Sequence, residues 1–191
     1  MKGKGILKSK WPYFLLVGAL SGASYAGLVS FKTEPKEKER VNVFLSSYGL
    51  DKEALLSFWN QRRSSSILRI NLSFYFSTSS DLGTLFTNQK GSADTFLLPS
   101  SFLKSLDQSM LSRDFIPLAK NEGGYSIDGV SYGELAYSSE AKSGVFSDWI
   151  VYEKAESPKD DYYIFYRRGS LHSTSLQRGL DDEAYRLWRE E

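Results

Sequence analysis

The sequence predicts an α/β domain, with a central and mainly parallel sheet of about five strands flanked by helices, preceded by one transmembrane helix. Two observations lead to this fold class. Between residues 41 and 106, short β-prone runs alternate with stretches of helical periodicity, an order typical of parallel sheets. Before them, residues 11–31 form 21 consecutive residues without a charge, which is long enough to cross a bilayer core of about 30 Å.

The N-terminal segment predicts how the chain sits in the membrane. The ten residues before the uncharged segment contain no acid and four lysines, Lys2, Lys4, Lys8 and Lys10. Lysines beside a membrane span stay in the cytoplasm. We therefore expect a cytoplasmic tail over residues 1–10, a single-pass anchor that contacts the lipid bilayer over residues 11–31, and an extracytoplasmic domain at the cell membrane. A cleaved secretory signal is the alternative, with Ala26 ending a small-residue cleavage site.

Composition narrows the function classes of the domain. Residues 32–40 are charged, contain Pro35 and read as a linker, which leaves residues 41–191 as the folded domain. The tail and the linker hold eight of the 24 basic residues and three of the 23 acidic ones, so the domain carries 16 bases against 20 acids. A mildly acidic domain without a basic cluster gives no reason to expect nucleic acid as a partner. Because the chain has no cysteine, disulfides, thiolate metal sites and a lipid-modified cysteine are excluded.

The domain begins with two predicted strands joined by a helix. Residues 41–47 are a compact run of β-prone side chains. Asp51 then stands as a helix N-cap before a segment whose apolar residues, ending at Trp59, follow helical spacing. Residues 67–76 alternate apolar and polar side chains, which is the pattern of a half-buried strand.

The same order then repeats. Ser79 or Ser80 can cap a short helix, residues 95–98 form a third short strand that a proline ends, and Ser100 or Ser101 can begin another helix. Successive strands joined through helices are parallel in nearly all such domains. These three strands are therefore expected to be the inner, parallel part of the sheet.

Beyond these units the pattern changes. Asp128 and Gly129 separate two β-prone runs, a strong signal for a two-residue hairpin turn, and we expect this hairpin at an edge of the sheet. Residues 149–152 and 161–167 read as further strands, the second of which returns to the sheet. Residues 181–191 start with acids, which favour the N-terminus of a helix.

Three stretches together carry a family resemblance. Residues 40–60 provide a strand and a first helix. Residues 91–137 place an acid before a core strand and a helix, and continue into the Asp-Gly hairpin. Residues 160–177 provide a strand followed by a Ser-x-His turn. This order resembles one lobe of the extracellular solute-binding proteins of bacterial ABC importers, particularly the carbohydrate-binding group.

The resemblance implies a single lobe of a type II periplasmic-binding-protein-like fold. Proteins of this family have two lobes and hold their ligand in the hinged cleft between them, whereas this chain has no room for a second lobe. The implied function is a membrane-anchored, solute-binding-like component of an ABC importer, with its permease subunits as partners and a saccharide or another polar solute as ligand. The alternative is a structural or regulatory subunit that binds no solute and docks on a transporter or another envelope protein.

The loops after the parallel strands are the expected ligand site. Open α/β sheets bind ligands beyond the carboxyl ends of their strands, and these ends correspond here to residues 46–48, 77–79 and 99–100. Hydroxyl, aromatic and carboxylate groups are the side chains that suit a sugar. The predicted ligand-binding residues are Ser46, Ser47, Tyr48, Thr78, Ser79, Asp94 and Ser100.

No pattern in the sequence predicts an enzyme, a metal or a cofactor. Ser-x-x-Lys occurs twice, beginning at Ser101 and at Ser139, but the accompanying Lys-Thr-Gly of penicillin-binding enzymes is missing. His172 is the single histidine, and without cysteine a metal site would need carboxylates as its other ligands. We assign His172 to a surface turn.

Overall fold

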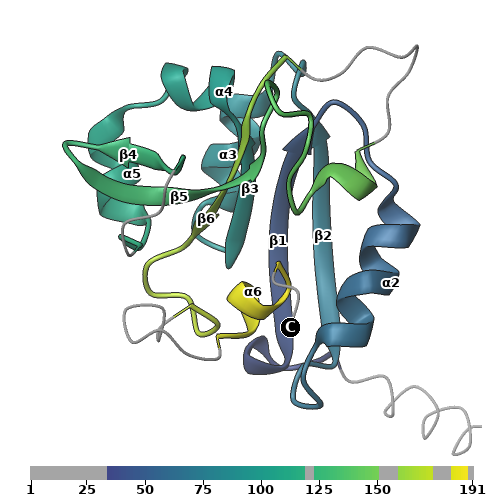
Figure 1. Cartoon of the computed structure of the whole chain (residues 1–191). Coiled ribbons are helices and arrows are strands. Elements are labelled where there is room, and N and C mark those ends of the chain that lie inside the picture. Colours follow the sequence, from purple (N-terminus) through teal and green to yellow (C-terminus); the bar gives the residue numbers. More distant parts are fainter. Residues whose placement is uncertain (1–33, 119–122, 151–158, 174–181, 189–191) are drawn as a thin grey trace, which may run out of the picture. The chain divides into compact units, whose positions relative to one another are not determined.

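The computed structural model describes residues 34–118, 123–150, 159–173 and 182–188 (Figure 1). The predicted anchor at residues 11–31 lies outside these ranges. Within them, no helix combines the length and the apolar character needed to cross a membrane. From Lys36 onward the described residues belong to one unit, and this unit contains the sheet and every helix discussed below.

A six-stranded sheet forms the centre of this unit, with the strands in the order β2-β1-β3-β6-β5-β4. The strands are β1 Arg40–Ser47, β2 Arg69–Phe76, β3 Thr95–Pro99, β4 Tyr125–Ile127, β5 Val130–Tyr137 and β6 Tyr162–Tyr166. The first three predicted strands are present, and the Asp-Gly hairpin of β4 and β5 lies at an edge as expected. The α/β class is thereby confirmed.

The sheet is mixed, and the prediction of a mainly parallel sheet is wrong. β1 runs parallel to β2 and to β3, but the pairings of β3 with β6, β6 with β5 and β5 with β4 are all antiparallel. β2 is an edge strand and not an inner one. The direction of β6 was not readable from its sequence, because all five of its residues are apolar or aromatic, and such a run has no preferred direction.

Helices cover both faces of the sheet. They are α2 Lys52–Arg62, α3 Leu82–Gln89, α4 Ser100–Ser105, α5 Gln108–Asp114 and α6 Glu183–Arg186, with short 3₁₀ turns η1 Glu37–Glu39 and η2 Ser147–Trp149. Figure 1 shows α2 on one side of β1 and β2, and α3 and α4 on the other. Alternation along β1 explains this arrangement: Val43 and Leu45 pack with α2, whereas Phe44 packs with α3.

Two predicted elements near the C-terminus differ from the structure. Trp149 ends η2 and Ile150 is irregular, so the described part of the predicted strand 149–152 is not a strand, and residues 151 and 152 lie outside the description. The C-terminal helix α6 is shorter than the predicted 181–191. Trp188, two residues beyond the end of α6, packs edge-on against Trp59 at a ring distance of 5.0 Å, so tertiary contacts hold this segment as much as helix propensity does.

The order of the first three strands decides where a ligand can bind. The chain leaves β1 through α2 to β2 on one side, and then returns through α3 to β3 on the other side of β1. The carboxyl ends of these three parallel strands meet at one edge of the sheet, where the loop after β2 leads into α3 and β3 leads into α4. The candidate site is found at this edge of the sheet.

Candidate functional site

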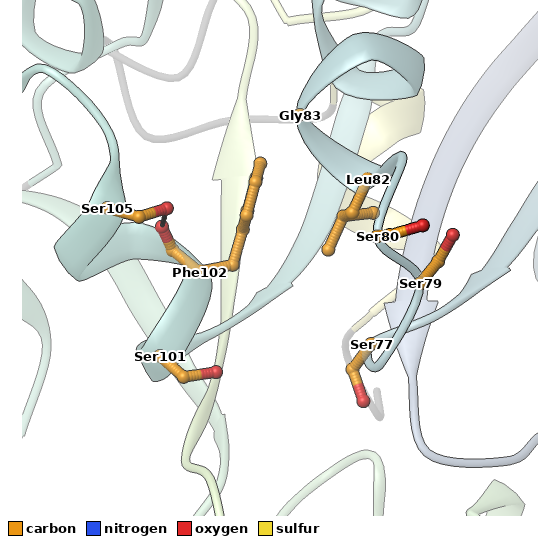
Figure 2. A pocket seen from close by; sticks show the side chains of 8 residues that line it. All are labelled: Ser77, Ser79, Ser80, Leu82, Gly83, Ser101, Phe102 and Ser105. Carbon is orange, nitrogen blue, oxygen red and sulfur yellow. Dashed lines mark hydrogen bonds between the residues drawn. The ribbon is translucent and has the colours of Figure 1, made fainter.

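A cleft of about 310 Å³ opens between α3 and α4 at the carboxyl edge of the sheet. This volume is at the lower end of the range for small-molecule sites, roughly 300–1,000 Å³. Figure 2 shows that the loop after β2 and the start of α3 form one wall, and that α4 forms the other. The lining residues are Ser77, Ser79, Ser80, Leu82, Gly83, Ser101, Phe102 and Ser105.

Serine hydroxyls dominate this lining, and α4 holds two of them in fixed orientations. The Ser101 hydroxyl donates to Asp160 Oδ2 at 2.8 Å, and the Ser105 hydroxyl donates to the carbonyl oxygen of Phe102 at 2.6 Å (Figure 2). A hydroxyl that donates in this way still presents two acceptor lone pairs. The α4 wall can therefore accept hydrogen bonds from a ligand, and the Phe102 side chain on the same helix adds an apolar ring to the lining (Figure 2).

Carboxylates lie at the start of both helices. Asp81 is the N-cap residue of α3, although its side chain makes no capping hydrogen bond. Asp160 caps α4 from a distant part of the chain, because its Oδ1 accepts from the Ser101 backbone N–H at 3.0 Å and from the Ser100 hydroxyl at 2.9 Å. Negative charge here offsets the positive ends of the helix dipoles. The lining contains no lysine or arginine, so the cleft favours a neutral polar ligand over an anion.

Gly83 keeps the α3 wall open. A Cβ atom placed on Gly83 would have no heavy atom within 4 Å, and its backbone is not in the left-handed region. Glycine in the first turn of a helix is unfavourable relative to alanine by up to about 1 kcal/mol. The absence of a side chain at Gly83 therefore has no local conformational reason, and its effect is to leave space in the cleft.

The structure brings together part of the predicted site. Ser79 lines the cleft, Thr78 is exposed in the same loop, and Ser100 directly precedes the lining residue Ser101. Ser79 is the one predicted residue among the eight that line the cleft, and sequence reasoning named neither the other seven nor Asp160 as ligand residues. Ser101 and Ser105 were accessible, because a helix that begins near Ser100 places positions 101 and 105 on one face. Asp160 was not, since it reaches α4 only through the return of the chain into β6.

The predicted residues after β1 lie beside the cleft without lining it. Ser46 and Ser47 are fully buried at the end of the strand. The Ser47 hydroxyl donates to the Gly49 carbonyl oxygen at 2.9 Å, whereas the Ser46 hydroxyl has no partner among the described residues. Tyr48 is 37% exposed, and its backbone N–H donates to the Tyr162 hydroxyl at 3.2 Å.

Tyr162 is a further residue that sequence reasoning did not identify. Its hydroxyl accepts the Tyr48 N–H and also makes a side-chain hydrogen bond with Ser77, so it connects the loops after β1 and β2. Burial raises the pKa of the Tyr162 phenol, and the bonds to Ser77 and Tyr48 partly oppose this effect. The phenol thus stays protonated and supports the loop that carries Ser77 and Ser79.

Asp94 lies at the opposite end of the sheet from the cleft. It precedes β3, so it belongs to the amino edge, and it is only 4% exposed. Its carboxylate accepts from the Asn42 backbone N–H at 2.7 Å and from the Ser170 hydroxyl at 2.5 Å, with Arg167 Nη2 at 3.7 Å. The structure therefore does not bring Asp94 together with the other predicted ligand residues, and its partners give it a structural role.

The residues considered for catalysis have other contacts. The Ser139 hydroxyl donates to Asp161 at 2.8 Å, and the Ser101 hydroxyl donates to Asp160 as described above. His172 is in a turn, but the prediction of a surface position is wrong: it is 6% exposed, with Nε2 at 3.2 Å from the Glu37 carbonyl oxygen. The described residues contain no group of three or more acids and histidines placed to hold a metal ion.

Comparisons with known proteins add no family assignment. No family model, no curated protein and no solved structure matches this chain at a significant level.

Proposed function

We propose that this chain is a membrane-anchored, extracytoplasmic solute-binding-like component of an ABC importer, and that its cleft contacts a neutral, polyhydroxylated solute such as a saccharide. The observation that carries the proposal is the lining of the cleft between α3 and α4, which contains five serines and one aromatic ring, with carboxylates at the starts of both helices. The resemblance of residues 40–60, 91–137 and 160–177 to solute-binding proteins supports the same class.

The chemistry of the lining supports a sugar over other small solutes. A sugar offers hydroxyl groups that donate and accept along its edge, and an apolar ring face that packs on an aromatic side chain. Ser101 and Ser105 provide acceptors, and Phe102 provides the ring. Asp81 and Asp160 oppose a phosphate or carboxylate group at the same place through charge repulsion.

The described residues form both walls of the cleft within a single lobe, and this sets the expected strength of binding. A two-lobed binding protein encloses its ligand on closure, whereas this cleft leaves one side of the ligand in solvent. We therefore propose weak capture. Anchoring through residues 11–31 would hold the domain beside its permease subunits, and the high local concentration would make a weak site useful.

Thermal unfolding of the full-length chain in a mild detergent tests solute binding. The panel contains glucose, maltose and sorbitol as neutral probes, with glucose 6-phosphate as the charged counterpart. A ligand at 100 times its dissociation constant adds about 2.7 kcal/mol to the free energy of unfolding. For a chain of this size, that corresponds to a rise of roughly 5–10 °C in melting temperature. We expect at least one neutral probe to raise the melting temperature in a saturable way and the phosphate to have no effect. A flat response to every neutral probe would reject solute capture.

A docking subunit without a ligand is the second candidate. The observation that favours it is the exposed Tyr48 ring at the same edge of the sheet as the open cleft, because aromatic side chains exposed near a concave surface are common in protein interfaces. In that case no solute of the panel changes the melting temperature, while extraction of native membranes with a gentle detergent recovers transporter subunits bound to this chain. Solute-dependent stabilisation would instead favour the binding function.

The proposed topology has its own test. Protease added to intact cells or spheroplasts is expected to digest the domain and to leave a short protected fragment that contains residues 1–31. Resistance of the domain until the membrane is broken would reverse the orientation. Release of a soluble domain that begins at Gly27 would show a cleaved signal in place of an anchor.

A further inference from the structure

The strand β2 forms one edge of the sheet, and its outer side is open. It pairs with β1 over eight residues, without a register shift, and the described residues provide no strand on its other side. Alternate N–H and C=O groups of an edge strand point away from the sheet and can pair with another strand. Natural edges are usually protected by proline, charge or a bulge, and β2 contains no proline and a single charge, at Arg69.

The apolar side chains along this edge share one face. Ile70, Leu72 and Phe74 are partly buried against the core on the α2 side. Leu68 precedes the strand and extends its pairing with the first strand, because its N–H donates to the Glu39 carbonyl oxygen at 2.7 Å. Since side chains alternate along a strand, positions 68 and 76 belong to the same face as the other three.

Two residues on this face are exposed, and they are placed symmetrically. Leu68 and Phe76 are each 58% exposed, and they lie four positions before and four positions after Leu72. Phe76 is fixed in position by an edge contact with Phe74, with ring centroids 5.2 Å apart. An exposed leucine and an exposed phenylalanine at equal spacing from a common centre make this edge self-complementary.

We propose that β2 is the interface of a homodimer, in which the β2 strands of two copies pair antiparallel about a two-fold axis at Leu72. The axis places Leu72 opposite its own copy, Ile70 opposite the partner's Phe74, and Leu68 opposite the partner's Phe76. Directly opposite side chains on one face of an antiparallel pair interact. Each exposed residue is thereby covered by the other, and the two sheets become one continuous sheet.

The other face of the strand agrees with this register. The same axis places Arg69 opposite the partner's Tyr75, a pairing of a cation with an aromatic ring. The two Arg69 side chains lie six positions apart, or about 20 Å at 3.4 Å per residue, which exceeds the screening length of about 8 Å in physiological salt. A one-residue slip would move the apolar side chains to the opposite face, so the register is specified by the sequence of this edge.

Because the chain has no cysteine, single-cysteine variants test this register without background. Residues directly opposite in an antiparallel pair have Cα atoms about 4.5 or 5.5 Å apart, and both distances suit a disulfide. The full-length chain in its native membrane is expected to form a disulfide dimer on mild oxidation when it carries Leu72→Cys, and also when it carries Leu68→Cys together with Phe76→Cys. The band should appear at twice the 21.6 kDa of the monomer.

Matched controls separate this register from random collision. Leu68→Cys alone should not cross-link, because the two copies of this position lie eight residues apart along the pair, about 27 Å. Val130→Cys is exposed on a different strand and should not cross-link either. Equal cross-linking of Leu68→Cys and Leu72→Cys, a Leu72→Cys yield no higher than that of Val130→Cys, or a product with a different protein would each overturn the proposal.

A second measurement needs no cysteine. Phe76→Lys replaces one exposed side chain of each pair by a charge, and sedimentation of the full-length chain in detergent should show a loss of dimer. Adding Leu68→Glu places an acid opposite that lysine, and the dimer fraction should recover. A wild-type chain that sediments as a monomer at all concentrations, or a Phe76→Lys chain that dimerises like wild type, would contradict the assigned interface.

Discussion

Replacement of Asp94 separates a structural role from a role in ligand binding. The carboxylate is nearly buried at the amino edge of the sheet, where it holds Asn42 of β1 and Ser170 of the segment after β6 through hydrogen bonds of 2.7 and 2.5 Å. Arg167 Nη2 lies 3.7 Å away. Asp94→Ala removes all of these contacts and leaves a guanidinium without its carboxylate partner.

The size of the effect follows from these contacts. A hydrogen bond to a charged group contributes about 1.5–3 kcal/mol, and breaking a buried ion pair on one side costs about 3–5 kcal/mol. We expect Asp94→Ala to lower the free energy of unfolding by about 3–5 kcal/mol, a fall of roughly 6–20 °C in melting temperature. Asp94→Asn keeps the shape of the side chain and one acceptor oxygen, so its free energy of unfolding should lie between those of wild type and the alanine variant.

Urea unfolding followed by tryptophan fluorescence measures this change, since Trp59 and Trp188 are buried in the core. Asp148→Ala is the control, because Asp148 is exposed and should change stability by no more than about 0.5 kcal/mol. Solute affinity of the folded Asp94→Asn variant should equal that of wild type. A loss below about 1 kcal/mol for Asp94→Ala, or loss of solute binding at unchanged stability, would refute the structural role.

Three further changes test the fold. Burial raises the folded pKa of Tyr162 above its unfolded value of about 10, so its contribution to stability is complete below pH 10 and is lost as pH rises further; Tyr162→Phe should weaken this alkaline loss in urea unfolding at rising pH. Asp51→Ala removes the N-cap of α2 and should lower the unfolding free energy by about 1 kcal/mol. At Gly133 a Cβ would lie 2.7 Å from the buried ring of Phe165, so Gly133→Ala should cost about 1–3 kcal/mol in the same assay, whereas Gly91→Ala, which meets no atom within 4 Å, should not.

The parallel part of the fold was predictable because its signals are local. β1 and β2 follow from β-prone or alternating residues, α2 begins after the Asp51 cap, and Pro99 ends β3. Parallel strands joined by helices meet at one edge with their carboxyl ends, and this rule located the loop that carries Ser79 and the start of α4. These predictions needed no knowledge of distant contacts.

The features of the fold and of the site that were not predicted depend on contacts between residues far apart in the chain. Asp94 was assigned to the site from its position before a strand, but its role comes from Ser170, which is 76 positions away. Asp160 reaches α4 from 59 positions away. β6 enters the sheet between β3 and β5, and a short run of buried residues carries no information about its direction or neighbours.

The central claim is that a neutral saccharide binds in the cleft between α3 and α4, and calorimetric titration of a blocked cleft tests it most directly. Gly83→Trp places a large side chain in the open space of the α3 wall without backbone strain, and Gly91→Trp adds the same side chain at an equally open position outside the cleft. The ligand is the neutral saccharide that stabilises wild type most. We predict that Gly83→Trp raises its dissociation constant at least about tenfold, which is a loss of about 1.4 kcal/mol in binding free energy. Gly91→Trp should leave the dissociation constant unchanged. Equal affinity of wild type and Gly83→Trp, or an equal loss in both variants, would contradict the account.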